Sequence, residues 1–267
     1  MAFAPSGSLL AVGLHGWAED KKDNQKTPLS TGECQLWDTN ADRKVPVATL
    51  TTKTNRAITA VAFSPEGRWL LTGDLDGQVL LWDVADPEKP KEGVLLGSHA
   101  GAVFALTLSA DGRTLATGGA DSSIKLWDLV ERRERPPPLK GHRGAVTRLV
   151  FLDKSESLAS TGHDRSVRIW DVAAGKERFA LPPQPNAIHS LAVSKDGNTL
   201  ALACQDRTIQ LWDLPSRQLR AVLLGHTREV NAVTFSQDGK LLVSASSPGF
   251  SNWVPRGGEV KIWKADE

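Results

Sequence analysis

Short runs of alternating apolar and polar or small residues, separated by turn sequences, make up most of the chain. Residues 98–128 show the pattern most fully. Residues 103–108 alternate, residues 109–112 carry the turn sequence Ser-Ala-Asp-Gly, and residues 114–117 and 124–127 are two further β-prone runs. This stretch therefore predicts a three-stranded antiparallel unit.

The same unit recurs along the chain, and tryptophan marks its period. A Trp closes each copy, followed by Asp in five copies and by Lys264 in the last, and the spacings between these Trp are 45, 45, 43, 42 and 51 residues. A fourth β-prone run, such as residues 45–50 or 220–224, follows each Trp except the last. The sequence thus predicts six repeats, closed by Trp37, Trp82, Trp127, Trp170, Trp212 and Trp263.

Six in-register copies with a closing Trp-Asp and a period in the forties resemble the WD-repeat β-propeller family. The resemblance covers nearly the whole chain. It implies an all-β fold, with residues 1–267 forming a single propeller domain of six visible four-stranded antiparallel blades. In this family an N-terminal segment usually supplies the outer strand of the last blade.

Both ends of the chain are short relative to the repeat. Residues 1–7 match only the second half of a strand and turn that is whole at residues 60–67, and the chain stops just past Trp263. We therefore expect the first and last blades to be incomplete and the chain to be the C-terminal part of a longer protein. Closure of the ring by side-chain packing alone is the alternative, and the number of blades in the native ring, six or seven, stays open.

The third and fourth repeats each carry His, Ser or Thr, Asp and Trp at the same spacing. His precedes Asp by 22 residues, the hydroxyl residue precedes Asp by four, and Asp precedes Trp by six. The resemblance implies structural tetrads, in which buried polar groups satisfy one another. A hydrolase triad is disfavoured because the set occurs in two repeats. The two sets are His99, Thr117, Asp121, Trp127 and His142, Ser160, Asp164, Trp170.

The other repeats keep only part of this set. In the second, Thr54 stands in place of His, with Asp76 at the Asp position. In the fifth, Gln184 and Leu202 replace the His and the hydroxyl residue, and in the sixth an insertion displaces the Asp. We therefore expect network stabilisation to concentrate in the middle blades.

Composition and charge narrow the classes of function. The formal net charge of +1 argues against a nucleic-acid binder, and no apolar run is long enough for a membrane span. The N-terminus does not resemble a signal peptide, so we expect a cytoplasmic protein. Cys34 and Cys204 are expected to pack as small apolar groups. With no phosphate loop, metal-ligand cluster or nucleophile and base outside the tetrads, we expect no enzyme activity, metal or cofactor.

Two insertions and one charged connection stand out. Residues 15–32 and 247–258 lengthen the loop between the second and third strands of the first and sixth repeats. If those repeats are ring neighbours, both insertions rise side by side from the face that also carries the blade-to-blade connections. Flexible insertions without a function are the alternative. In residues 131–140, Arg132, Arg133 and Arg135 form a basic patch that neighbouring Glu residues half neutralise, so we expect a solvated loop, with a site for an acidic partner as the alternative.

We therefore expect a monomeric, non-catalytic protein–protein interaction scaffold that presents loops on one propeller face to a protein or peptide partner. A C-terminal regulatory or targeting module of a longer enzyme, and a propeller that binds a small ligand, are the alternatives. The resemblance implies which positions point toward that face. The expected partner-binding residues are Phe104, Thr147, His163, His189, Gln205, Glu229 and Asn231, together with Trp17, Phe250 and Trp253 of the insertions.

Overall fold

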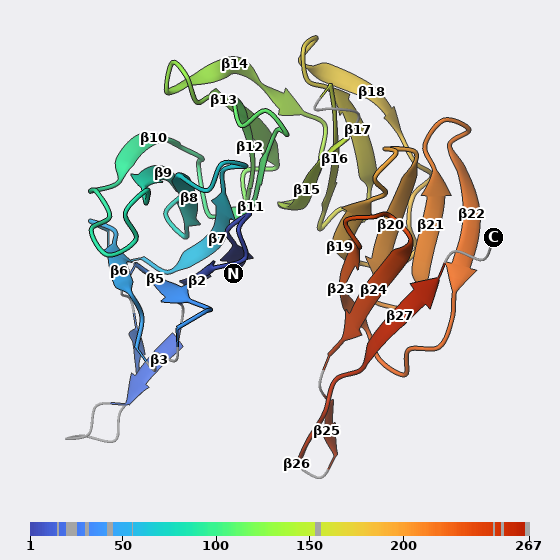
Figure 1. The fold of residues 1–267 in the computed structure, drawn as a ribbon. Helices are drawn as coiled ribbons and strands as arrows, with labels where there is room; N and C mark the ends of the chain where they lie inside the picture. Colours follow the sequence, from blue (N-terminus) through green and yellow to red (C-terminus); the bar gives the residue numbers. More distant parts are fainter. Residues whose placement is uncertain are drawn as a thin grey trace. The chain divides into compact units, whose positions relative to one another are not determined.

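The structure is a computed structural model that describes residues 1–14, 16–19, 26–29, 32–41, 45–54, 56–152, 156–247, 249–251 and 254–264. All regular elements in these ranges are β-strands, as the sequence predicts. The chain divides into two compact units, Met1–Val146 and Thr147–Glu267, which are described separately here. We call the sheet formed by one repeat a blade and number the blades in chain order (Figure 1).

Unit 1 holds three four-stranded antiparallel blades, with strand orders β1-β2-β5-β6, β10-β9-β8-β7 and β11-β12-β13-β14. Each blade is therefore a simple meander, which is what short turns between consecutive strands dictate. The strands are β1 (Ala2–Phe3), β2 (Leu9–Gly13), β5 (Glu33–Asp38), β6 (Ala48–Thr51), β7 (Ile58–Phe63), β8 (Trp69–Asp74), β9 (Gln78–Asp83), β10 (Val94–Ser98), β11 (Val103–Leu108), β12 (Thr114–Gly119), β13 (Ser123–Asp128) and β14 (Arg133–Lys140).

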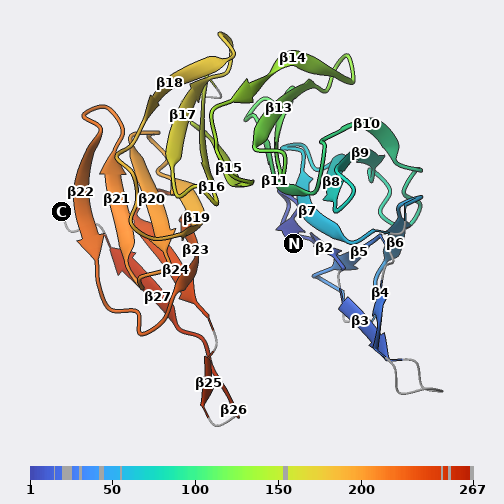
Figure 2. The ribbon, with the colours of Figure 1, turned by 180° about the vertical axis from the view of Figure 1, so that it is seen from behind.

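Unit 2 holds two four-stranded blades and one three-stranded blade, with orders β15-β16-β17-β18, β19-β20-β21-β22 and β23-β24-β27 (Figure 2). The first strand of blade four begins at the last residue of unit 1. The strands are β15 (Val146–Leu152), β16 (Ser157–Gly162), β17 (Val167–Asp171), β18 (Lys176–Ala180), β19 (Ile188–Val193), β20 (Thr199–Cys204), β21 (Ile209–Asp213), β22 (Gln218–Leu223), β23 (Val230–Phe235), β24 (Leu241–Ser246) and β27 (Val260–Lys264).

The closing Trp of every repeat lies on the third strand of its blade, opposite a leucine of the second strand. In blade three this pair is Leu115 and Trp127, and Trp127 is fully buried. Because a slip of one residue would turn the Trp to the other side of the sheet, this pairing fixes the register. The corresponding pairs are Leu10–Trp37, Leu70–Trp82, Leu158–Trp170, Leu200–Trp212 and Leu242–Trp263.

The predicted turn at residues 109–112 joins the first two strands of blade three. Ser109 Oγ accepts the Thr114 amide at 2.8 Å, and the Gly112 amide donates to the Ser109 carbonyl at 2.9 Å. Gly112 has a φ of 69°, which explains the glycine. Serine caps the same turn in blades two, five and six, through Ser64, Ser194 and Ser236.

Neighbouring blades within each unit pack through small residues on second strands. In unit 1, a Cβ added at Gly73 would lie 2.6 Å from Val103, and one added at Gly118 would lie 2.7 Å from Val146. In unit 2, Ala203 belongs to the same buried cluster as Val230, the residue that opens blade six. At these positions the first residue of one blade packs against a small residue of the previous blade.

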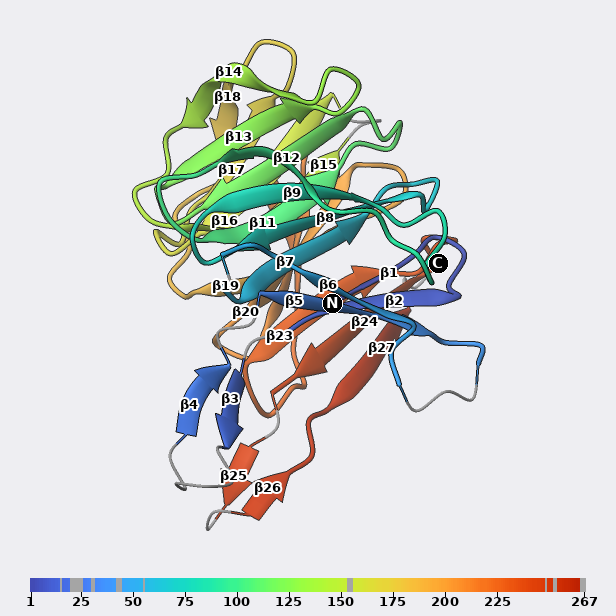
Figure 3. The ribbon, with the colours of Figure 1, turned by 90° about the vertical axis from the view of Figure 1, so that its left-hand side faces the viewer.

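The first and last blades are incomplete, as predicted. Strand β1 has two residues, and blade six has no fourth strand among the described residues. In the first insertion, β3 (Gly16–Glu19) pairs with β4 (Lys26–Leu29), and in the second, β25 (Gly249–Ser251) pairs with β26 (Val254–Arg256) (Figure 3). Each insertion thus contains a hairpin between the second and third strands of its blade, and their closeness in a ring stays a prediction.

Candidate functional site

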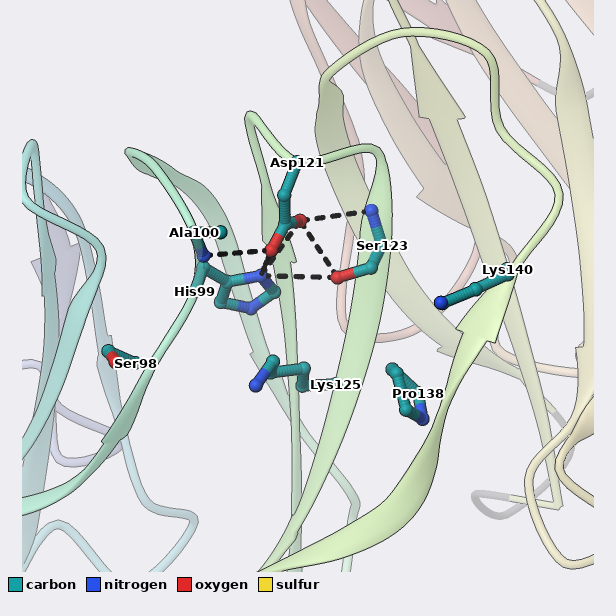
Figure 4. A pocket seen from close by; sticks show the side chains of 8 residues that line it. All are labelled: Ser98, His99, Ala100, Asp121, Ser123, Lys125, Pro138 and Lys140. Carbon is teal, nitrogen blue, oxygen red and sulfur yellow. Dashed lines mark hydrogen bonds and ion pairs between the residues drawn. The ribbon is translucent and has the colours of Figure 1, made fainter.

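Blade three contains a continuous chain of hydrogen bonds around His99 (Figure 4). His99 Nδ1 lies 3.0 Å from Asp121 Oδ2, and Nε2 lies 2.7 Å from Thr117 Oγ1. The Trp127 indole donates to the same hydroxyl at 2.8 Å. Asp121 also accepts the amide and the hydroxyl of Ser123, at 3.0 and 2.8 Å. The structure thus joins the four residues that the spacing groups, together with Ser123, which the spacing does not reveal.

One arrangement of protons satisfies the whole chain. The Trp127 indole donates to Thr117, the Thr117 hydroxyl donates to His99 Nε2, and His99 Nδ1–H donates to Asp121, which makes His99 neutral. Burial lowers the pKa of His99, although the carboxylate opposes this effect. Burial also raises the pKa of Asp121, but hydrogen bonds from Ser123 and His99 outweigh it and lower that pKa to about 2. The network therefore contains an ionised Asp and a neutral His.

We expect the folded state to lose stability as the pH falls below 6.5, the ordinary pKa of histidine. Because the pKa of His99 is lower in the folded state, the unfolded chain binds more protons in this range, and acid favours unfolding. Urea unfolding of the wild type and of His99→Gln at about pH 7.5 and about pH 5.5 measures the effect. Glutamine already stands at the corresponding position 184. Equal losses in both proteins would contradict the assignment.

In the second predicted tetrad, the contact between the Trp indole and the hydroxyl residue lies in blade four, within unit 2. Trp170 donates to Ser160 at 2.7 Å, and both residues are buried. Asp164 accepts the amide and the hydroxyl of Ser166, at 3.1 and 2.8 Å, just as Asp121 accepts those of Ser123. His142 is a buried residue of unit 1.

In blade two the polar network uses a different carboxylate, Asp74, from the Asp76 that the repeat spacing indicates. Trp82 donates to Thr72 at 3.0 Å, but Thr54 donates to Asp74 at 3.2 Å, and Asp74 is buried. Asp76 instead forms an exposed ion pair with Arg56 at 3.4 Å. Threonine is shorter than the histidine it replaces, so its hydroxyl meets a carboxylate on the strand rather than one in the turn. Burial raises the pKa of Asp74.

In blade six, Glu259 takes the place of the Asp that the insertion displaces. Glu259 Oε2 lies 3.3 Å from His226 Nδ1 and accepts the Thr227 amide at 3.1 Å, while Oε1 accepts the Thr227 hydroxyl at 2.7 Å. His226 Nε2 lies 2.6 Å from Ser244 Oγ, which accepts the Trp263 indole at 2.8 Å. The sequence does not reveal this role, because Glu259 follows the insertion instead of lying in a short turn.

Blade five replaces both missing partners with amides. Asn186 donates to Asp206 at 2.9 Å, so an amide reaches the carboxylate that histidine contacts in blade three. The Trp212 indole donates to Gln210 at 2.9 Å, because Leu202 has no hydroxyl. Polar satisfaction is therefore conferred by different residues in different blades, which identifies the tetrads as structural.

A groove of roughly 440 Å³ opens beside the blade-three network, between β10 and β14 (Figure 4). Its walls carry both signs of charge, including Asp121, Lys125 and Lys140. Lys125 is already paired with Glu134 at 2.9 Å. A lining of mixed charge, with one cation engaged, selects no single class of ligand.

A larger pocket of roughly 500 Å³ lies in unit 2, where the connection from blade four to blade five meets the turns after β16 and β20. Four of the predicted partner-binding residues line it: Thr147, His163, His189 and Gln205. We call it the loop-face pocket. Its other lining residues are Arg148, Gly162, Arg165, Pro185, Asn186, Ala187 and Ile188.

Two contacts shape the walls of the loop-face pocket. Arg165 has a φ of 60°, and its Nη1 donates to the Pro185 carbonyl at 3.0 Å, which connects the turn after β16 to the blade-to-blade connection. His189 Nε2 lies 3.4 Å from Glu229 Oε2. The sequence nominates His189 and Glu229 but not Arg165, because the position after the turn Asp points into the pocket only in this backbone conformation.

Of the other predicted partner-binding residues, the described Phe104, Glu229 and Asn231 are not part of this lining. Phe104 is a partly buried residue of β11 in unit 1, and the Asn231 side chain donates to Ser247 in blade six. Trp253 lies outside the described residues, as do the side chains of Trp17 and Phe250. The part played by the insertions therefore stays a prediction.

Other candidate chemistry has a structural explanation. Burial raises the pKa of the Cys34 thiol to about 12 and that of Cys204 to about 11, so neither is a reactive thiolate. The expectation of a loop at residues 131–140 was wrong for most of that stretch, because Arg133–Lys140 form strand β14, paired with β13; there Arg133 pairs with Glu131, and Arg135 pairs with Asp128 at 3.1 Å. Among the described residues, no group of three or more His, Cys, Asp or Glu has the geometry of a metal site.

No helix in the described ranges has the length and hydropathy needed to cross a membrane. A search of curated proteins gives no match. The family model described as "WD domain, G-beta repeat" matches residues 44–83, 91–128, 135–171, 175–213 and 217–264. Each segment runs from the outer strand of one blade to the third strand of the next. Such repeats generally mediate protein–protein interaction. Since the matched segments cover most of its length, the chain belongs to the WD domain, G-beta repeat family.

Proposed function

We propose that this protein is a non-catalytic scaffold that binds a protein or peptide partner at the loop-face pocket. The observation that carries the proposal is the convergence of Thr147, His163, His189 and Gln205 on one pocket of roughly 500 Å³. These residues come from four separate segments of unit 2, namely β15, the turn after β16, β19 and the turn after β20, and each was nominated from its place in the repeat. Concave sites with a few converging polar groups are typical binding sites.

The side chains of the pocket favour binding over catalysis. No Ser, Cys, Asp or Glu occurs among its lining residues, so the described pocket offers neither a serine or cysteine nucleophile nor a carboxylate base. The Thr147 hydroxyl is directed to the Thr161 carbonyl, at 3.4 Å. His163 and Gln205 are exposed polar residues of the lining, the type of side chain that contacts a partner at the rim of an interface.

Replacing both His163 and Gln205 by alanine should reduce capture of the physiological partner by about tenfold, because both residues are exposed and line the pocket. Affinity purification of the tagged full chain with quantitative mass spectrometry measures the loss. Fold integrity is checked by thermal unfolding, which should not change.

A matched control comes from the turns between the first and second strands of blades five and six. Lys195→Ala with Lys240→Ala changes two exposed residues of unit 2 outside the pocket. We expect this control to retain the partners that the pocket variant loses. Equal recovery of all partners by the wild type and the pocket variant would refute the proposal.

A further inference from the structure

We propose that the loop-face pocket recognises an anionic side chain of the partner, a carboxylate or a phosphorylated residue, and that Glu229 is an internal competitor for that anion. This inference rests on the proposed function and names the chemistry of its ligand. The observations that support it are the charges of the lining residues, the engagement of the nearby acids, and the incomplete contact between Glu229 and His189.

The lining of the pocket carries cations and histidines but no acid. Of its eleven residues, two are Arg and two are His, whereas Asp and Glu are absent from this described set. The mixed groove in unit 1 contains Asp121 as well as two lysines, so a lining without acid is particular to the loop-face pocket among these two. An environment of this kind attracts a negative group and repels a positive one.

The acids closest in sequence to the pocket are committed elsewhere. Asp164 accepts the amide and the hydroxyl of Ser166. Asp206 accepts the Asn186 amide group at 2.9 Å and the Thr208 hydroxyl at 2.6 Å. Both carboxylates therefore stabilise the turns that shape the pocket, and neither belongs to its lining.

The two arginines retain donors for a ligand. Arg165 uses one N–H for the Pro185 carbonyl, and Arg148 uses one for the carbonyl of the preceding Thr147. A guanidinium has five N–H donors, so each arginine keeps several. Desolvation lowers the pKa of Arg148 although the residue is exposed, and no ion pair to an acid is found for Arg148 among the described residues. An incoming anion would compensate its charge.

The ring nitrogen Nε2 of His189 lacks a hydrogen bond within the described part of the protein. This atom is buried, and Glu229 Oε2 lies 3.4 Å away. The Glu229 side chain is exposed on about half of its surface, 49%, so it can move aside. A partner carboxylate or phosphate that reached His189 would therefore replace a poorly aligned internal acid with a better-placed external one.

Synthetic peptide libraries of about ten residues test the inference on the immobilised full chain. Three libraries share random flanks and differ in a fixed central residue, which is Gln, Glu or phosphoserine. We expect the wild type to retain the Glu or the phosphoserine library about tenfold better than the Gln library, the gain of one charge-assisted hydrogen-bonded pair. Which of the two prevails identifies the source of the anion, and excess inorganic phosphate should compete with the phosphoserine library.

Charge-removing variants connect this preference to the pocket. Arg148→Gln and Arg165→Gln should each reduce it about tenfold, whereas Glu229→Gln should increase it about threefold. Arg207→Gln is the matched control, because Arg207 occupies the turn position of Arg165 in the next blade, with a φ of 75°, and does not line the pocket. The preference should survive in this control.

Two unfavourable outcomes are distinct. If peptides are retained in a pocket-dependent way without preference for an anionic centre, the inference is wrong and the proposed function stands. If no library is retained, the proposed binding of peptides fails, and the inference fails with it. An anionic preference that Arg148→Gln, Arg165→Gln and Glu229→Gln leave unchanged would also overturn the inference, since the anion would then bind elsewhere.

Discussion

Replacing Thr117 by valine is expected to lower the free energy of unfolding by about 3 kcal/mol. Thr117 is fully buried, accepts the Trp127 indole at 2.8 Å and lies 2.7 Å from His99 Nε2. Valine keeps the shape of threonine but removes the hydroxyl, so a buried N–H donor and a buried ring acceptor both lose their partner. Urea unfolding at neutral pH, followed by tryptophan fluorescence, measures the change.

Two variants show whether the hydroxyl is responsible. Thr117→Ser keeps it and removes one methyl group, which should cost about 1 kcal/mol. Serine already occupies the equivalent position in blades four and six, as Ser160 and Ser244. Thr51→Val, at an exposed site on β6, should change stability by less than about 0.5 kcal/mol. A loss in Thr117→Ser as large as that in Thr117→Val would count against the network as its cause.

Replacing Gly77 by alanine should also destabilise the protein by about 3 kcal/mol. Gly77 has a φ of 88°, and an added Cβ would lie 2.5 Å from the His99 carbonyl oxygen and 2.6 Å from that of Gly101. Both obstacles are backbone atoms, and the His99 amide donates to the Gly77 carbonyl at 3.0 Å. Relief of the clash would therefore displace the segment that positions His99. Thermal and urea unfolding measure the cost.

Gly175→Ala is the matched control for this clash. Gly175 has a φ of 64°, but a Cβ there meets nothing within 4 Å, so only the conformational cost of about 1 kcal/mol remains. Ser122 occupies the position of Gly77 in blade three with a φ of 63°, which shows that a side chain is tolerated there when space allows. Equal effects of Gly77→Ala and Gly175→Ala would show that the close approach is unimportant.

Much of the fold could be predicted because its signals repeat at fixed intervals. The closing Trp occupies the same place in all six blades, so its spacing identifies strands, register and blade boundaries together. The blade-three network could be grouped for the same reason, since its residues are separated by short turns of constant length. Because the turns have a constant length, residues at a fixed spacing in the sequence also lie at a fixed distance in the structure.

The residues that escaped prediction lie where this constancy fails. Glu259 follows an insertion, so its distance from His226 along the chain differs from that of its equivalents. Asp74 replaces Asp76 because the contact depends on the reach of Thr54, which residue spacing does not describe. Arg165 faces the loop-face pocket through a positive φ at a non-glycine residue, a conformation that the sequence does not signal.

Glu259 lies where the insertion of blade six rejoins the blade. Two hydrogen bonds join Ser246 and Glu259 at the base of the insertion. The Ser246 amide donates to the Glu259 carbonyl at 2.8 Å, and the Glu259 amide donates to Ser246 Oγ at 3.2 Å. The β25–β26 hairpin can therefore be lengthened, shortened or exchanged for a foreign loop while the blade keeps its buried network, and this makes it a natural site for the evolution or engineering of new binding sequences.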